Sequence, residues 1–236
     1  MHPAKWKSTQ TLLIDADDTL WENNIYFERA IAGFISYLDH HEYSPAQVRE
    51  TLNEVEREHT SAHGYGVASF RKSLVTCFER LSVEPVTPER HDRIASFAQA
   101  IIDQEIELLP GVDITLPRLA ERHQLILMTK GNEAEQLDKL ARSGLRKFFA
   151  AIEVPREKNP AAYATVREKY TLDPSTTWMI GNSPRSDINP ALASGLHAVY
   201  IHHPNTWILE HDQLEVAPDG QTLLEVESFL KLAEIF

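Results

Sequence analysis

The stretch Thr11–Asn24, TLLIDADDTLWENN, places a short, mainly apolar run directly before three acids. Residues 11–14 have the pattern of a buried strand. Asp15, Asp17 and Asp18 follow it almost without a spacer. Crowded carboxylates raise one another's pKa, so like charge gathered at a strand end favours a cation or a positively charged partner at the same place.

The segment 23–108 has the pattern of a helical block. Its first helix is indicated by apolar residues that recur every three or four positions, namely Ile31, Phe34, Ile35 and Leu38. Ser44-Pro45 and Thr87-Pro88 each combine an N-cap residue with proline at the first helical position. The further helices predicted here run over 45–59, 67–81 and 88–108, with a loop at 61–66.

After the break LLPGV at 108–112, the pattern alternates between strand and helix. The predicted strands are 124–128, 150–154, 176–180 and 197–201, and the predicted helices are 113–122, 133–143, 160–169, 187–194 and 222–235. Such alternation is typical of a parallel sheet covered on both faces. We therefore predict an α/β fold with a doubly wound, Rossmann-like parallel sheet, formed by residues 1–22 and 109–236. An all-helical cap domain, 23–108, is inserted after the first strand.

Composition narrows the classes of partner. The 236 residues carry a formal net charge of −12, which argues against a nucleic-acid polymer as partner. The one cysteine, Cys77, permits no disulfide framework within the chain, and a small buried role is expected for it. No apolar segment has the length of a secretory signal or a membrane span. We expect a cytoplasmic protein that contacts no membrane, and the oligomeric state is left open.

Polar residues follow four of the predicted strands at the point where each strand ends. They are Asp15, Asp17 and Asp18; Thr129, Lys130, Gly131 and Asn132; Lys158; and Asn182 and Asp187. Ligands of doubly wound sheets bind beyond the carboxyl ends of the strands, so these groups are expected to meet at one edge.

The chemistry of these groups points to phosphate. Oxygen ligands from Asp15, Asp17 and Asp187 suit a hard cation such as Mg²⁺, while lysine suits a phosphate. One carboxylate can attack phosphorus as a nucleophile. A second carboxylate two residues later can protonate the leaving oxygen and then activate water.

These residues resemble the four motifs of the haloacid dehalogenase-like (HAD) hydrolase superfamily, in its phosphatase branch. DADDT resembles the first motif, LILMT the second, Lys158 in EKNPAAY the third and IGNSPRSDINPALASG the fourth. All four occur in order, and the resemblance covers nearly the whole chain. It implies a Mg²⁺-dependent phosphatase with a cap that closes over a small phosphate ester.

The resemblance also implies a role for each matching residue. Asp15 would be the nucleophile and Asp17 the general acid and base, whereas Thr129 and Lys158 would bind the phosphoryl group. Mg²⁺ would be held by the Asp15 carboxylate, the Asp17 carbonyl and the fourth motif.

Contacts around the substrate are less specific predictions. Asp18, Lys130, Gly131 and Asn132 are candidates for substrate binding. Lys130 could equally be solvated surface, Gly131 could simply permit the turn, and Asn132 could cap the next helix.

Two positions depart from the family pattern. The fourth motif usually begins Gly-Asp, but here Asn182 follows Gly181, so Asn182 offers only a carbonyl oxygen and Asp187 would supply the charge. Asp18 stands where the family often has glycine. DADDTL looks closest to members that act on nucleoside monophosphates, and a sugar phosphate is the other substrate considered.

Three other functions stay open at this point. A 2-haloacid dehalogenase would use the same nucleophile at carbon, but such enzymes lack the second acid. A phosphomutase differs only in its substrate. A non-catalytic phosphate-binding protein would fit the loss of an aspartate at Asn182.

Overall fold

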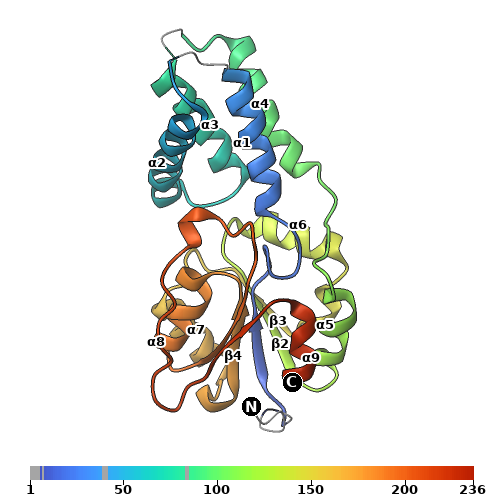
Figure 1. The fold of residues 1–236 in the computed structure, drawn as a ribbon. Coiled ribbons are helices and arrows are strands. Elements are labelled where there is room, and N and C mark those ends of the chain that lie inside the picture. The colour runs from blue at the N-terminus through green and yellow to red at the C-terminus, as the bar shows by residue number, and fades with distance from the viewer. Residues whose placement is uncertain (1–5, 7, 39–41, 83–84) are drawn as a thin grey trace. The chain divides into compact units, whose positions relative to one another are not determined.

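The computed structural model describes residues 6, 8–38, 42–82 and 85–236 (Figure 1). The chain divides into two compact units, Met1–Glu22 with Ile106–Phe236, and Asn23–Glu105. The chain returns to the first unit three residues earlier than the predicted position 109. The reason is pairing near this boundary: the Glu22 N–H donates to the Glu107 carbonyl at 2.9 Å, and Trp21 forms an isolated antiparallel bridge with Leu108.

The first unit is built on a parallel sheet of six strands, in the order β3-β2-β1-β4-β5-β6. The strands are β1 (Thr11–Ile14), β2 (Gln124–Met128), β3 (Ala151–Glu153), β4 (Thr177–Gly181), β5 (His197–Ile201) and β6 (Leu223–Val226). The predicted α/β class and doubly wound sheet are confirmed. The order places β1 between β2 and β4, where the direction of winding reverses and where such sheets bind ligands.

The predicted helix over 222–235 is wrong. Its first part is the edge strand β6, paired in parallel register with β5 from Ala198↔Leu223 to Ile201↔Val226. Only the end is helical, in the 3₁₀ turn η5 (Phe229–Lys231) and the short helix α9 (Leu232–Ile235). Pairing with β5 buries Leu224, and this long-range contact outweighs local helical preference.

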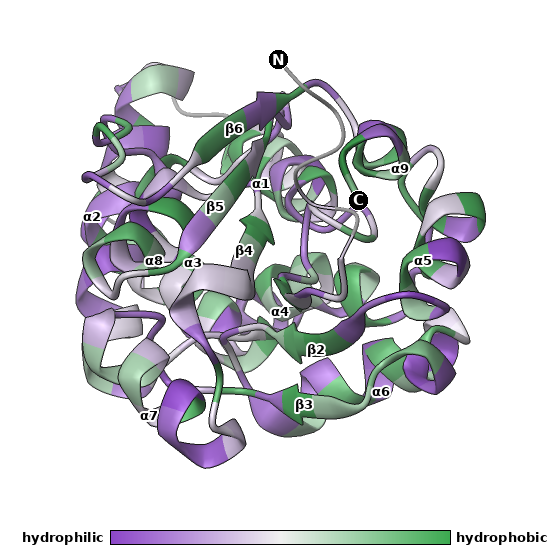
Figure 2. Ribbon diagram, turned by 90° about the horizontal axis from the view of Figure 1, so that it is seen from below, coloured by the Kyte–Doolittle hydropathy of each residue, from purple (hydrophilic) through white to green (hydrophobic). Residues whose placement is uncertain are grey.

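Helices cover both faces of the sheet, so its strands are apolar on both sides. Figure 2 shows α5, α6 and α9 on one side of the sheet and α7 and α8 on the other. Neighbouring residues of one strand therefore enter different cores: Leu12 and Ile14 join the cluster with α5 and α9, whereas Leu13 joins the cluster with α7. The bounds are α5 (Val112–Ala120), α6 (Glu133–Ser143), α7 (Pro160–Tyr170) and α8 (Asn189–Ala193).

The predicted helix 187–194 is divided in the structure. A π-helical turn, η3 (Pro184–Ile188), precedes α8, and the Ser183 side chain accepts a hydrogen bond from the Ser186 N–H at its start. Wider turns of this kind occur often at functional sites. The remaining 3₁₀ turns are η1 (Arg146–Phe148), η2 (Pro174–Thr176) and η4 (Ile208–Glu210).

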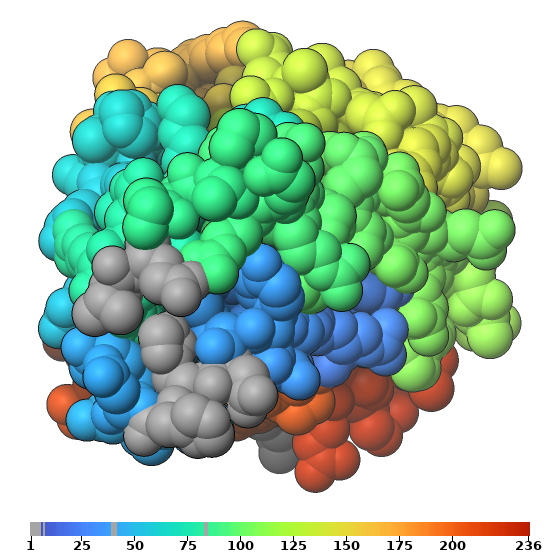
Figure 3. Space-filling view, turned by 90° about the horizontal axis from the view of Figure 1, so that it is seen from above, coloured from blue at the N-terminus to red at the C-terminus, as the bar shows by residue number. Residues whose placement is uncertain are grey.

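The second unit consists of helices that pack around their own apolar core. They are α1 (Asn24–Leu38), α2 (Pro45–His63), α3 (Val67–Leu81) and α4 (Pro88–Ile102). Blue atoms of α1 and green atoms of α4 lie side by side in the space-filling view (Figure 3). Cys77 is fully buried in this core, as expected.

Two helix ends in this unit differ from the prediction. Helix α2 continues through 61–63, which the sequence pattern placed in a loop, and ends only at Gly64, whose φ of 82° is in the left-handed region. Helix α4 ends at Ile102 rather than at 108, because the chain beyond it leaves for the sheet unit. Among the described residues, no helix combines the length and apolar character that crossing a membrane requires.

Glu56 on α2 provides a test of stability against pH. Burial raises its pKa from 4.5 to about 7, with Arg49 lowering it and Glu28 raising it. Between pH 4.5 and about pH 7, Glu56 keeps its proton in the folded protein and loses it in the unfolded chain. The free energy of unfolding therefore falls as pH rises through this range. Glu56→Gln should therefore gain up to about 3 kcal/mol over the wild type above about pH 8, and little at low pH.

The measurement is urea unfolding of both proteins across this pH range. Glu54→Gln, at an exposed position on the same helix, is the matched control and should track the wild type. A Glu56→Gln protein whose advantage is the same at every pH would contradict the assignment of the buried proton to Glu56.

Candidate active site

Asp15 lies at the carboxyl end of β1, in the centre of the sheet. Its backbone N–H donates to the Ile180 carbonyl at 2.9 Å, which extends the pairing of β1 and β4 by one residue. This hydrogen bond holds the Asp15 backbone at the point where the winding of the sheet reverses, and the residue as a whole is buried. The first acid of the opening stretch is thus fixed by the sheet itself.

Lys158 joins two of the predicted acids. Its ammonium group donates to Asp15 Oδ1 at 2.5 Å and to Asp187 Oδ1, and it also donates to the Met128 carbonyl at 3.3 Å. The three side chains of this trio, Asp15, Lys158 and Asp187, are almost completely buried, at 8%, 2% and 0% exposed. Four strand ends therefore meet at one ammonium group.

Local sequence explains how Lys158 reaches this point. Asn159 is the N-cap of α7 and accepts from the Ala162 N–H at 3.0 Å, and Pro160 occupies the first helical turn. Lys158 thus stands immediately before a helix whose start is well defined. Tyr163 on the first turn of α7 donates to the Ser186 carbonyl at 2.9 Å, which connects this helix to η3.

Asp187 approaches the sheet closely because residue 181 is glycine. A Cβ at Gly181 would lie 2.2 Å from Asp187 Oδ2, a distance that no side chain tolerates. Asp187 Oδ2 instead accepts from the Ser183 N–H at 2.9 Å. The glycine of the fourth motif therefore provides space for a carboxylate six residues later.

The pKa values within the trio reflect burial and charge. The pKa of Asp187 is raised to about 7, first by burial and then by the charge of Asp15, against the lowering effect of Lys158. Burial also raises the pKa of Asp15, against the effect of Lys158. For Lys158, burial lowers the pKa, but the two carboxylates outweigh burial and raise it above the ordinary value. The ammonium form of Lys158 is therefore strongly favoured.

Asn182 is connected to Asp15 through a threonine. Thr19 Oγ1 donates to Asp15 Oδ2 at 3.0 Å and lies 3.3 Å from Asn182 Oδ1, while Asn182 Nδ2 donates to Thr206 Oγ1 at 3.0 Å. Asn182 thus directs its carbonyl oxygen toward the Asp15 side of the site and its amide nitrogen toward the loop after β5.

Asp17 lies beside the trio but has its own donors. Its carboxylate accepts from Lys139 Nζ at 2.7 and 2.9 Å, from Gln136 Nε2 at 2.9 Å and from Trp21 Nε1 at 2.8 Å. Burial raises the pKa of Asp17, but Lys139, Gln136 and Trp21 outweigh burial, and the net shift is downward. Its charge in turn raises the pKa of Asp15. The second acid is held here as a carboxylate.

The residues after β2 are placed differently from one another. Thr129 is 1% exposed and directly follows Met128, whose carbonyl contacts Lys158. Lys130 forms an ion pair with Glu210 and donates to Ser186 Oγ at 2.8 Å. Asn132 caps α6 by accepting from the Glu135 N–H at 3.1 Å.

Gly131 and Asp18 adopt left-handed backbone conformations, with φ of 133° and 58°. Asp18 is a non-glycine residue in this region, which explains why glycine is common at this position in the family that the sequence resembles.

Several residues of the site were missed by sequence reasoning. They are Thr19, Lys139, Thr206 and Glu210. A signal exists for two of them: Thr19 is the threonine of DADDT, and Lys139 lies three positions after Gln136, on the same face of α6. Thr206 lies in the loop after β5 and Glu210 ends the 3₁₀ turn η4, and in neither place does a periodicity point to a partner.

The donor set around the trio fits a divalent cation. Two carboxylates share a single ammonium group in a place from which water is largely excluded, and the pKa of both is raised, so keeping both ionised requires more positive charge than Lys158 supplies. The oxygens nearby belong to carboxylate and amide groups, which are the ligands that Mg²⁺ prefers. The residues that could hold the ion are Asp15, Asp187, Asn182 through its carbonyl oxygen and Asp17 through its main-chain carbonyl.

Comparison with known proteins gives the following. The sequence model of a family described as haloacid dehalogenase-like hydrolase matches residues 9–195. No curated protein matches the chain. A haloacid dehalogenase-like family hydrolase from Xanthomonas campestris is 28% identical, with a TM-score of 0.80 over 96% of this chain and 94% of that chain.

Two further solved structures are similar in fold. One is a HAD hydrolase from Bacillus subtilis bound to magnesium, 18% identical, with a TM-score of 0.68 over 97% of this chain and 99% of that chain. The other is L-2-haloacid dehalogenase from Xanthobacter autotrophicus, 16% identical, with a TM-score of 0.66 over 96% and 98%. The neighbours thus include more than one chemistry on the same fold.

The contact between Gly181 and Asp187 can be tested by a double-mutant cycle. Gly181→Ala should destabilise the protein by about 1–3 kcal/mol, the usual cost of overpacking, because the new methyl group must displace the carboxylate. In an Asp187→Ala background the two closest contacts are absent, so the same substitution should cost less. Urea unfolding of the four proteins measures the difference, and equal costs in both backgrounds would contradict this account.

Proposed function

The chain belongs to the haloacid dehalogenase-like hydrolase family, and we propose that within this family it is a magnesium-dependent phosphatase of small phosphomonoesters. The observation that carries the proposal is the pairing of two carboxylates, Asp15 and Asp187, on the one ammonium group of Lys158. Asp17 provides the further acid that phosphate transfer requires, two residues from the nucleophile.

In the first half of the reaction, an oxygen of the Asp15 carboxylate attacks phosphorus. The bond between phosphorus and the ester oxygen breaks, and the leaving oxygen takes a proton from Asp17. Lys158 and Thr19 orient the attacking carboxylate by binding one oxygen each. Asp17 must be protonated for this step, and the negative charge of a bound phosphate would favour that form against the effect of Lys139.

In the second half, water attacks the phosphorus of the aspartyl phosphate at Asp15. Asp17, now a carboxylate, takes a proton from that water, and the bond between phosphorus and Asp15 breaks to release inorganic phosphate. Lys139, Gln136 and Trp21 suit this half, because all three donate to the ionised form of Asp17. Thr129 and Lys158 would bind the phosphoryl oxygens throughout.

Magnesium, when bound, would neutralise charge on the phosphoryl group during transfer. Asp15, the Asp17 carbonyl, Asn182 and Asp187 would hold it. The presence of only one ammonium group for the two carboxylates of the trio supports this assignment, and the relative from Bacillus subtilis is described as bound to magnesium.

Two candidate substrate contacts beyond the phosphoryl group already have partners within the protein. Lys130 is paired with Glu210 and Asn132 caps α6, so both would have to exchange partners in order to bind substrate. We propose a nucleoside monophosphate or a sugar phosphate as the substrate, and the cytoplasm as the place where the enzyme acts. Dehalogenase chemistry at carbon has no use for an acid at Asp17, and for this reason we place it second.

Asp15→Asn tests the nucleophile. Hydrolysis of an aryl phosphate with Mg²⁺ present should fall by about 10⁴-fold or more, the order observed when an enzyme nucleophile is removed. Asp219→Asn, an exposed aspartate far along the chain, is the matched control and should keep wild-type activity. Chelation of Mg²⁺ should likewise abolish turnover, and adding it back should restore turnover.

Two results would reject the proposal. Near wild-type phosphatase activity in Asp15→Asn would exclude Asp15 as nucleophile. Halide release from a 2-haloacid that is indifferent to chelator, with no phosphate ester hydrolysed, would assign the protein to dehalogenase chemistry instead.

Asn182→Asp tests the altered fourth motif. The substitution adds a carboxylate beside the trio, so Mg²⁺ should bind more tightly than in the wild type. Calorimetric titration with Mg²⁺ measures the change, and Thr206→Val, which removes the hydroxyl that accepts from Asn182, controls for loss of that hydrogen bond. Equal or weaker affinity in Asn182→Asp would mean that residue 182 is not a ligand.

A further inference from the structure

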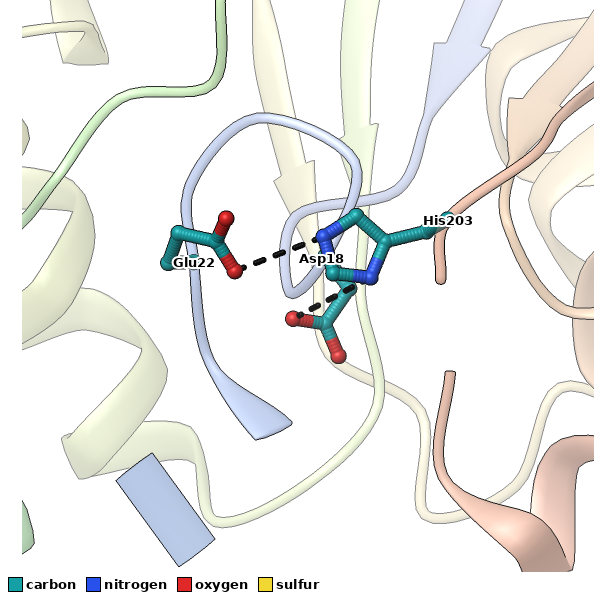
Figure 4. A group of neighbouring side chains, drawn as sticks. All are labelled: Asp18, Glu22 and His203. Atoms are coloured by element: carbon teal, nitrogen blue, oxygen red, sulfur yellow. Dashed lines mark ion pairs between the residues drawn. The ribbon is translucent and has the colours of Figure 1, made fainter. Parts of the chain in front are cut away.

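A second group of possible ligands lies next to the first motif. The imidazole of His203, in the loop after β5, is located between the carboxylates of Asp18 and Glu22, in the loop after β1 (Figure 4). His203 Nε2 is 3.3 Å from Glu22 Oε2, and Nδ1 is 3.9 Å from Asp18 Oδ1. One ligand atom from each of the three residues lies within 4.8 Å of the other two.

The histidine is buried with unused bonding capacity. Its side chain is only 6% exposed, and its Nδ1 atom is buried with no hydrogen-bond partner. The 3.9 Å to Asp18 is too long for a hydrogen bond. A buried ring nitrogen without a partner is costly, and here it faces a carboxylate oxygen. The observation therefore indicates a missing ligand between them, independently of the acidic character of the cluster.

We propose that Asp18, Glu22 and His203 form a metal site for a transition-metal ion such as Zn²⁺, distinct from the magnesium ligands around Asp15 and Asp187. Imidazole together with carboxylate is a donor set that suits Zn²⁺, whereas Mg²⁺ prefers oxygen ligands alone. Zinc bonds of about 2.0–2.2 Å put neighbouring ligand atoms roughly 3.5 Å apart. The two printed distances involve opposite nitrogens of the ring, and one ion binds only one of them, so the imidazole or the Glu22 side chain must rotate to bring both carboxylates to the same nitrogen. The ligand atoms start within 4.8 Å of one another.

The site would connect two loops that the sheet keeps apart. β1 and β5 are separated by β4, so the loops after them meet only above the carboxyl end of the sheet. The loop after β5 also supplies Thr206 to Asn182 and Glu210 to Lys130. An ion at His203 would hold this loop against the first motif, and three protein ligands leave a further coordination position for water or for a ligand oxygen.

The test uses the full-length protein, freed of metals and then saturated with Mg²⁺. His59 and His63 on α2 have neighbouring rings, 5.7 Å apart, and could bind zinc by themselves, so all variants carry His63→Gln. Each Mg²⁺-saturated protein is titrated with Zn²⁺ in a calorimeter, and the zinc affinities are compared. The proteins are this background, His203→Gln and the matched control His202→Gln, which removes the adjacent exposed imidazole.

The background and His202→Gln should bind Zn²⁺ with equal affinity, and His203→Gln at least about tenfold more weakly. Glu22→Gln should also weaken binding. Thermal unfolding gives an independent reading, because Zn²⁺ should raise the Tm of the background protein but not that of His203→Gln.

Equal zinc affinity in His203→Gln and the background, or no zinc binding in the background, would overturn the proposal. Asp15→Asn should bind Zn²⁺ as the background does, so the outcome is separate from that of the phosphatase assay.

Discussion

The ammonium group of Lys158 is the contact on which the site depends. It is buried between Asp15 and Asp187, and three loops that follow β1, β3 and β4 are joined through it. Removing one member of a buried charged group leaves an uncompensated charge, which usually costs about 3–5 kcal/mol. The pairing therefore constrains the loops thermodynamically as well as arranging the groups for chemistry. Lys158 also supplies one positive charge for two carboxylates whose pKa values are raised, and a metal ion would favour the ionised form of both.

Around this contact the protein separates its acids by giving them different partners. Asp15 and Asp187 share Lys158, whereas Asp17 is held by Lys139, Gln136 and Trp21. Burial raises the pKa of Asp187 and Asp15, and donors lower that of Asp17. In the first half of the proposed reaction Asp15 would attack as a carboxylate and Asp17 would give up a proton, so a bound cation and a bound phosphate would have to reverse both shifts. The environment, rather than the residue type, distinguishes the two aspartates.

Much of the fold could be predicted from local patterns. Apolar runs indicated five strands, and cap signals at Ser44 and Thr87 indicated the starts of α2 and α4. The edge strand β6 was predicted as part of a helix, because its pairing with β5 is a long-range contact that no local pattern reveals. The end of α4 was predicted too late for a related reason. Glu107 and Leu108, after the helix, pair with Glu22 and Trp21, which are far away in the sequence.

The sequence by itself determined which polar groups stand at the ends of the strands, because strand ends, helix caps and glycine turns are written in neighbouring residues. It placed Asp15, Lys158 and Asp187 at one edge of the sheet. Only the tertiary structure decided which groups pair: Lys130 with Glu210, 80 residues away, and Asp17 with Lys139, 122 residues away. Which side chains form a pair depends on their distance and burial in the folded protein, and neither can be inferred from their spacing in the sequence.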